Sequence, residues 1–142
     1  SLSFEPTVRK QALIIVKNVP DKDYDGEINA VYEWVRDNIR YVRDPARVEM
    51  IHIPTRILEY RQGDCDDHAI INSALLGSLG HSTRFMVVKV QPDSQSYDHV
   101  YCEALLKNGK WIPLDTTNKK GRLGWYPKDT YKRGFINVTE EG

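Results

Sequence analysis

A mostly apolar stretch that directly follows a cysteine between acidic residues constrains the fold more than any other part of the chain. The stretch reads AIINSALLGSL over residues 69–79, follows the segment GDCDDH at residues 63–68, and stops at Gly80. Asp64 is a suitable N-cap, and the two aspartates after the cysteine favour the positive end of a helix. Glycine is common just after a helix ends. The pattern predicts a buried helix that carries Cys65 in its first turn.

A cysteine in the first turn of a helix is suited to nucleophilic chemistry. Backbone N–H groups without a partner inside the helix lie near it, and the helix dipole favours a thiolate. Asp66 and Asp67 act in the opposite direction, because nearby negative charge disfavours a thiolate. A nucleophilic Cys65 therefore needs a basic partner.

Composition limits the classes of protein to consider. The chain has 142 residues, 40% of them hydrophobic and 28% charged, and its formal net charge is zero, so we expect one globular domain that binds neither nucleic acid nor an acidic membrane. No apolar run approaches the roughly 20 residues of a membrane span. Two cysteines do not make a disulfide scaffold. We expect a cytoplasmic protein without a visible signal peptide, although a removed leader remains compatible with a chain that begins at Ser1.

The periodicity changes from helical to strand-like at Gly80. Before it, residues 27–40 carry an apolar stripe at helical spacing, and the apolar run at 13–16 suits a helix or a short buried strand, of which we favour the helix. The other predicted elements are a helix over 7–17, a polar loop over 18–26, a loop over 41–54 with an extended piece at 50–53, a short helix over 56–60, and strands over 83–90, 98–106 and 110–115. The tail over 119–142 is expected to wrap the sheet or line a groove.

A histidine and an aspartate lie on two strands that should be neighbours. His99 stands near the start of one strand and Asp115 at the end of the next, with the hairpin signal KNG at residues 107–109 between them. A thiol nucleophile needs a base, and the base needs a carboxylate to orient it and stabilise its charged form. We predict that Cys65, His99 and Asp115 fill these three roles.

The length of the hairpin loop tests this prediction. With a two-residue loop, Asp115 would face away from His99. With a three-residue loop and Gly109 in the left-handed conformation, Asp115 lies opposite Tyr101 and on the same face as His99. We predict the three-residue loop or an equivalent one-residue bulge. The same alternation places Cys102 on the opposite face, as a small buried residue without a disulfide to Cys65.

Three sequence blocks resemble those of the transglutaminase-like superfamily of papain-like cysteine enzymes. They are GDCDDHA at 63–69, DHVYCEA at 98–104 and WIPLDTT at 111–117, and the upstream WVRDNIRY at 34–41 and DP at 44–45 also resemble it. The similarity covers about residues 27–118 and is closest to small, stand-alone bacterial or prophage members. It implies an α+β papain-like fold, in which N-terminal helices, including a buried helix that bears the cysteine, pack on an antiparallel sheet. It also implies a Cys65–His99–Asp115 triad and acyl transfer without metal or cofactor.

The resemblance implies attack of Cys65 on a peptide or isopeptide amide. The Cys65 N–H and a second donor would hold the oxyanion; Gln62 is the first candidate for that donor and Trp34 the second, although a half-buried packing role suits Trp34 better. We favour hydrolysis of a protein or peptide over crosslinking, because the chain is short and has no obvious calcium loop. The oligomeric state stays open.

Other interpretations of the same residues remain. A catalytically idle papain-like module that binds an extended peptide would have the same fold and differ only in the state of the thiol. A third interpretation is a structural or assembly protein whose aromatic tail docks onto a partner. A metal site at residues 64–68 is disfavoured, because the start of a helix does not direct consecutive side chains at one ion. His68 is expected to be exposed or hydrogen-bonded in the first turn of the helix.

Overall fold

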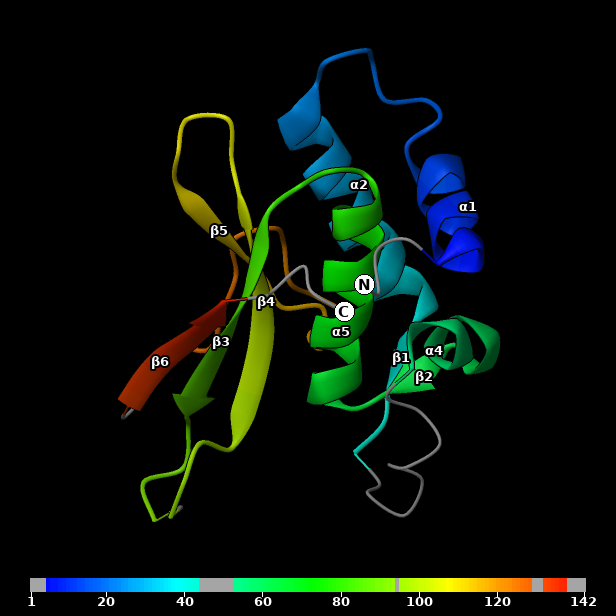
Figure 1. Ribbon diagram of the computed structural model, residues 1–142. Coiled ribbons are helices and arrows are strands. Elements are labelled where there is room, and N and C mark those ends of the chain that lie inside the picture. Colours follow the sequence, from blue (N-terminus) through cyan, green and yellow to red (C-terminus); the bar gives the residue numbers. More distant parts are fainter. Residues whose placement is uncertain (1–4, 44–52, 94, 129–131, 138–142) are drawn as a thin grey trace.

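The computed structural model describes residues 5–43, 53–93, 95–128 and 132–137, and it has an α+β architecture (Figure 1). The helices are α1 (Pro6–Ile15), α2 (Tyr24–Asn38), α4 (Pro54–Tyr60) and α5 (Cys65–Ser78). The strands are β1 (Arg40–Tyr41), β2 (Gln62–Gly63), β3 (Thr83–Lys89), β4 (His99–Leu105), β5 (Trp111–Leu114) and β6 (Lys132–Asn137). Among the described residues, no helix is long and apolar enough to cross a membrane.

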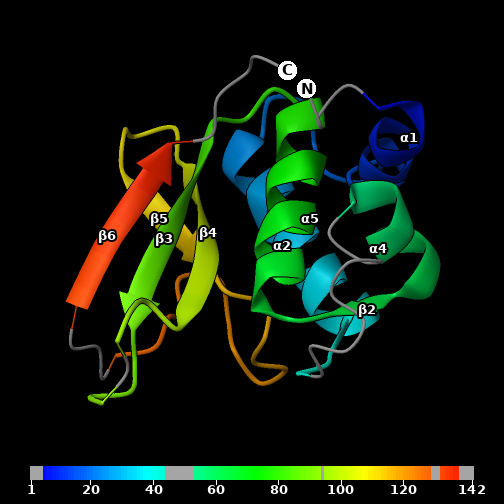
Figure 2. The ribbon, with the colours of Figure 1, turned by 60° about the horizontal axis from the view of Figure 1, so that its bottom comes forward.

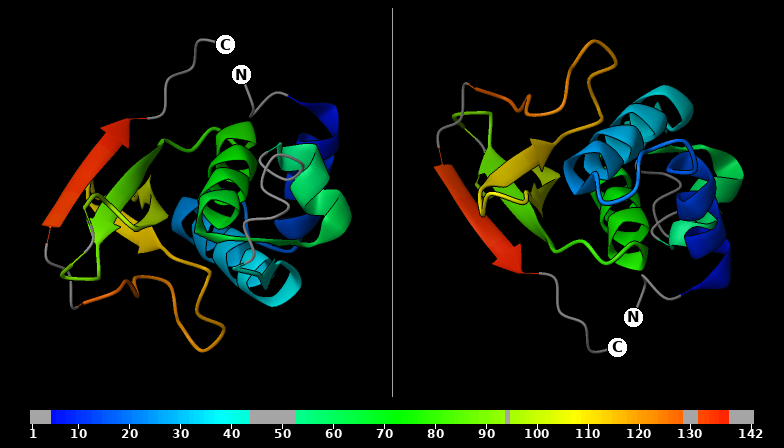
Figure 3. Two further views of the ribbon diagram at one scale, coloured as in Figure 1. Left: turned by 90° about the horizontal axis from the view of Figure 1, so that it is seen from below. Right: turned by 90° about the horizontal axis from the view of Figure 1, so that it is seen from above.

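Helix α5 lies at the centre of the molecule, with the sheet on one side and the other helices on the other (Figures 1 and 3). A helix that is apolar around most of its circumference is suited to this position. Ile71, Leu75 and Leu76 are completely buried, in one core cluster with side chains of α1, α2, α4 and the sheet. The predicted buried helix is therefore confirmed, and it ends as expected, because Gly80 has a φ of 91° two residues beyond Ser78.

The sheet is antiparallel and has the strand order β5-β4-β3-β6. The β4–β5 register pairs Cys102 with Leu114, and the Leu106 N–H donates to the carbonyl of Lys110 over 2.8 Å. Leu106 and Lys110 therefore close a three-residue loop, in which Gly109 has a φ of 88°. The predicted loop length and the left-handed glycine are both confirmed.

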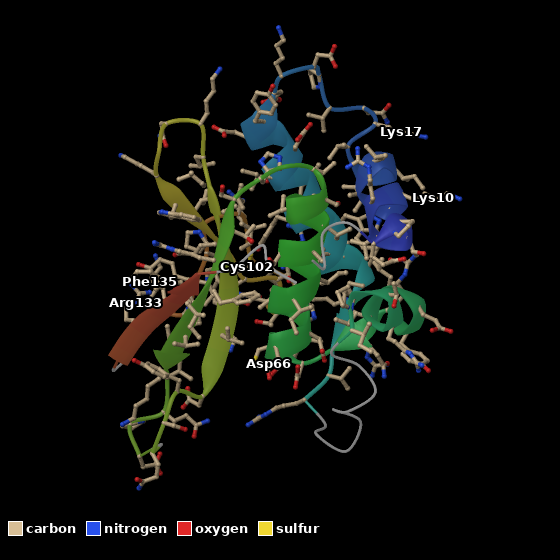
Figure 4. All side chains as sticks on the ribbon, viewed as in Figure 1. Lys10, Lys17, Asp66, Cys102, Arg133 and Phe135 are labelled. Carbon is tan, nitrogen blue, oxygen red and sulfur yellow. The ribbon has the colours of Figure 1, made fainter. Side chains whose placement is uncertain are left out.

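The far face of the sheet carries a second, smaller cluster. Met86, Val88 and Tyr101 are buried there, and Tyr126 of the C-terminal segment packs on them. Figure 4 shows Arg133 and Phe135 of β6 on this side, away from α5. The tail thus wraps the sheet, as expected, and it also adds β6 to it.

Several boundaries differ from the sequence prediction. The loop predicted over residues 18–26 is wrong for its last three residues, because Asp23 caps α2 by accepting from the Gly26 N–H over 3.1 Å. Arg40 belongs to β1 rather than to the helix predicted over 27–40, and the two-residue strands β1 and β2 had no signal. The helix predicted over 7–17 exists as α1, but it begins at Pro6 and ends at Ile15. The extended piece predicted over 50–53 lies outside the described residues, apart from Ile53.

Candidate active site

A reciprocal capping box fixes the N-terminus of α5, where Cys65 lies. The Asp67 N–H donates to the side chain of Asp64, and the Asp64 N–H donates to the side chain of Asp67, each over 3.1 Å. This arrangement satisfies two backbone donors of the first turn and does not use the Cys65 N–H. Cys65 itself is partly exposed. The cap therefore holds a thiol and a neighbouring N–H donor at an accessible helix end.

The capping box requires a glycine directly before it. A Cβ atom on Gly63 would lie 2.4 Å from the Cβ of Asp67, far inside van der Waals contact. Gly63 is buried and pairs with Tyr41 through the parallel β1–β2 ladder. The chain can therefore approach α5 at this angle only because residue 63 has no side chain.

His99 and Asp115 meet as the hairpin register requires. The Nε2 atom of His99 lies 2.7 Å from Oδ2 of Asp115, whose exposed fraction is only 1%. The other carboxylate oxygen of Asp115 accepts from the N–H of Thr117 over 3.1 Å and from its hydroxyl over 2.7 Å. Asp115 is thus held from both sides, and it fixes the orientation of the imidazole.

The electrostatics of His99 favour its charged form. Burial lowers the pKa of His99, but hydrogen bonds to Asp115 and Cys65 outweigh burial and raise the pKa to about 10. The Nε2 atom lies against Asp115, so Nδ1 is the ring nitrogen that remains for an interaction with Cys65. A protonated imidazole therefore lies between the thiol and the carboxylate.

His68 has a different role from His99. It is 2% exposed, and its Nδ1 lies 2.7 Å from the hydroxyl of Thr116, which also accepts from the side chain of Asn72 over 3.0 Å. Burial lowers the pKa of His68 to about 4, so this imidazole is neutral at physiological pH. The contacts fasten the segment after β5 to α5, and thereby keep Asp115 near Cys65. Of the two expectations for His68, the hydrogen-bonded one is confirmed.

The two predicted oxyanion donors lie in different surroundings. Trp34 packs against the core, and the guanidinium of Arg61 lies 4.9 Å from the centre of its ring. These contacts favour the packing interpretation of Trp34. Gln62 lies in β2, three residues before Cys65, and is partly exposed. Its assignment as a donor stays a prediction.

Tyr41 is a candidate that the sequence analysis missed. Partial burial raises the pKa of Tyr41, and the charge of Cys65 is the next largest cause. Its ring lies 6.0 Å from the ring of His68, edge to face. Tyr41 ends the block WVRDNIRY, which resembles the family, but the sequence predicts a loop at this position because a two-residue strand has no periodicity.

Cys102 lies apart from the site. It is completely buried between the sheet and α5, and burial raises its pKa well above the usual range. Both cysteines are free. The predicted burial of Cys102 and the absence of a disulfide to Cys65 are confirmed.

Three solved structures share the fold of this chain. A candidate cysteine protease from Cytophaga hutchinsonii has a TM-score of 0.64 and 21% identity over 91% of this chain and 42% of its own. A candidate protease from Parabacteroides distasonis has a TM-score of 0.63 and 12% identity over 79% and 23%. LapG from Legionella pneumophila has a TM-score of 0.60 and 16% identity over 94% and 87%. The chain thus spans less than half of the first two proteins.

The family assignment comes from the sequence. The model of the transglutaminase-like superfamily matches residues 14–116, which is most of the chain. The protein therefore belongs to the transglutaminase-like superfamily. No curated protein sequence gives a significant match.

Proposed function

We propose that the protein is a cysteine-dependent hydrolase that cleaves peptide or isopeptide amides through a Cys65–His99–Asp115 triad. One observation carries the proposal: the Nε2 atom of His99 lies 2.7 Å from Oδ2 of the buried Asp115, and Cys65 is close enough to His99 to raise the pKa of the imidazole as well. A protonated imidazole next to a thiol stabilises the thiolate, which is the nucleophilic form. The candidate proteases among the similar structures are consistent with this chemistry.

The first half of the reaction forms a thioester. The Cys65 thiolate attacks the amide carbonyl carbon, and the carbonyl π electrons move to oxygen. The Cys65 N–H at the helix end donates to this oxyanion, since the capping box does not use it. The carbon–nitrogen bond then breaks, and the Nδ1 proton of His99 passes to the departing amine. Asp115 holds the ring in position throughout.

The second half hydrolyses the thioester. The now neutral His99 accepts a proton from a water molecule, and the resulting hydroxide attacks the acyl carbon. Collapse of the second tetrahedral intermediate releases the carboxylic acid and returns the Cys65 thiolate beside a protonated His99. A primary amine in place of water would give a new amide, so hydrolysis and crosslinking share every step up to this one.

A second oxyanion donor completes the proposed site. Tyr41 is the best candidate, because its hydroxyl is a hydrogen-bond donor and the charge of Cys65 acts on it. Gln62 is the alternative, by its position in β2. Trp34 is the least suited of the three, because its ring is covered by Arg61.

The pH dependence of thiol labelling tests the triad. Wild type, His99→Ala and Asp115→Asn are treated with iodoacetamide between pH 5 and 9, and each cysteine is followed by mass spectrometry. We expect Cys65 to react rapidly at pH 6 in the wild type, and at least about tenfold more slowly in both variants, because His99→Ala removes the imidazolium and Asp115→Asn removes the carboxylate that stabilises it. The fully buried Cys102 is the internal control and stays unmodified in the folded protein.

Identical labelling profiles in all three proteins would contradict the triad and leave the idle peptide-binding module as the better interpretation. If Cys65 reacts as expected, a peptide mixture with an added primary amine separates the two outcomes of acyl transfer. Hydrolysis produces new carboxyl termini, whereas crosslinking produces amides of the added amine, and mass spectrometry distinguishes them.

A further inference from the structure

An apolar pocket of about 250 Å³ lies beside the proposed active site, between α5 and the sheet. Asp66, Ala69 and Ile70 line it from the helix, and Phe85 and Val100 line it from β3 and β4. The helix residues stand at spacings of three and four, so they share one face of α5. Figure 2 shows α5 running alongside β4 and β3.

The sheet register explains why two apolar side chains point into this space. Cys102 faces α5, and Phe85 is its direct partner across the β3–β4 ladder. Val100 precedes Cys102 by two residues, so its side chain points to the same side of the sheet. Phe85 and Val100 are both partly exposed, although they lie on the face that α5 covers. The protein's own side chains therefore do not fill the space between α5 and this part of the sheet.

The pocket lies one residue along the chain from two of the proposed catalytic residues, on the face of the sheet that α5 covers. Asp66 directly follows Cys65 on α5, and Val100 directly follows His99 on β4. Figure 4 shows Asp66 at the end of α5 that is close to β4. A substrate held at the thiol would extend from Cys65 past the exposed Asp66, which is the residue that begins the pocket on α5.

The residues that line the pocket favour an apolar side chain of the substrate. Apart from Asp66, every residue that lines the pocket is apolar. The volume lies below the 300–1,000 Å³ typical of whole small-molecule sites, and it suits a single side chain. A carboxylate at the mouth repels an acidic side chain, and a polar one would lose its hydrogen bonds to water inside.

We propose that this pocket is a specificity site that receives an aliphatic side chain of the substrate, adjacent to the bond that Cys65 attacks. The proposal rests on the proposed function and adds the substrate class to it: polypeptides with leucine, isoleucine, valine or methionine beside the scissile amide. Apolar contacts made by that side chain position the amide carbonyl next to the thiolate.

Cleavage-site profiling tests the pocket. Wild type, Ile70→Phe, Phe85→Ala and the control Ile14→Phe are incubated with a proteome-derived peptide library, and the two residues on each side of every cleaved bond are counted. Ile70→Phe narrows the pocket and Phe85→Ala widens it. Ile14 makes a matched control, because it is 51% exposed on α1, outside the pocket.

We expect aliphatic residues to be enriched and acidic residues depleted at one position in the wild type and the control. Ile70→Phe should shift the preference toward alanine and glycine by at least about tenfold, which is the effect of single methylene groups in apolar pockets. Phe85→Ala should admit larger side chains. A library cleaved without aliphatic preference, or with the same preference in every variant, would overturn the pocket and leave the proposed hydrolase intact.

A second measurement keeps the two proposals separate if no peptide is cleaved. N-acetyl-leucinamide and N-acetyl-glycinamide are titrated into methyl-labelled Cys65→Ser protein, and the methyl resonances of Ile70 and Val100 are followed by NMR. Larger shifts with the leucine compound at both residues, and a smaller Val100 shift in Ile70→Phe than in the parent protein, support the pocket even where hydrolysis fails. Equal shifts with both compounds overturn it.

Discussion

At the scale of single residues, the protonation state of His99 depends on the segment that follows β5. Burial alone would lower the pKa of this imidazole, and the hydrogen bonds to Asp115 and Cys65 reverse the direction. Asp115 is itself held in place, since Thr117 donates two hydrogen bonds to its other oxygen. The neighbouring Thr116 ties the same segment to His68. The charge state of the proposed base is therefore maintained by contacts outside the three proposed catalytic residues.

The identity of the second oxyanion donor can be decided by two substitutions. Removal of one such donor typically lowers kcat by about 10²–10³-fold and changes KM little, because the interaction forms only in the transition state. We expect Tyr41→Phe to show this loss and Gln62→Ala to show none. Steady-state kinetics on a peptide substrate measures both. The reverse result would assign the donor to Gln62, and full activity in both variants would exclude both side chains.

At the scale of elements, the entry of the chain into α5 determines where the thiol lies. A methyl group at residue 63 would meet the Cβ of Asp67 at 2.4 Å, so Gly63→Ala must displace the capping box. We expect a loss of about 1–3 kcal/mol in the free energy of unfolding, as for other overpacked sites, together with slower iodoacetamide labelling of Cys65. Urea denaturation and mass spectrometry give the two quantities.

Gly80→Ala at the other end of α5 is the matched control. Gly80 has a φ of 91°, and nothing lies within 4 Å of a Cβ built there. The substitution therefore strains the backbone, at a cost of about 1–3 kcal/mol, without touching the capping box. Labelling of Cys65 in folded Gly80→Ala should match the wild type. An equal loss of labelling in both variants would mean that stability, rather than the local clash, controls the thiol.

The same elements show which parts of the fold a single sequence encodes locally. Helix α5 was predictable because its apolar run, its N-cap and Gly80 all lie within one segment. The β4–β5 register was predictable because Gly109 specifies the turn. Strand β6 carries charged residues and Gly134, and it becomes a strand only by pairing with β3, far away in the sequence. Tyr41 was missed for the same reason: its position depends on the two-residue ladder between β1 and β2.

At the scale of the whole molecule, two histidines give opposite dependences of stability on pH. Burial lowers the pKa of His68 to about 4, whereas the unfolded residue binds a proton near pH 6.5. Below pH 6.5 the unfolded state thus binds a proton that the native state does not, and stability falls as the pH drops toward 4. This difference amounts to about 3 kcal/mol. The raised pKa of His99 acts in reverse: its contribution is complete below pH 6.5 and is lost as the pH rises toward 10.

Unfolding measurements on three proteins separate the two contributions. Wild type, His68→Asn and His99→Asn are denatured with urea at pH 4.5, 6.5 and 9, because differences between variants cancel the titration of the other groups. We expect His68→Asn to lose less free energy of unfolding than the wild type between pH 6.5 and 4.5, and His99→Asn to lose less between pH 6.5 and 9. If His68→Asn and the wild type weaken equally on acidification, His68 is not buried in its neutral form. The contact between the segment after β5 and α5 would then need a different explanation, and so would the position of Asp115.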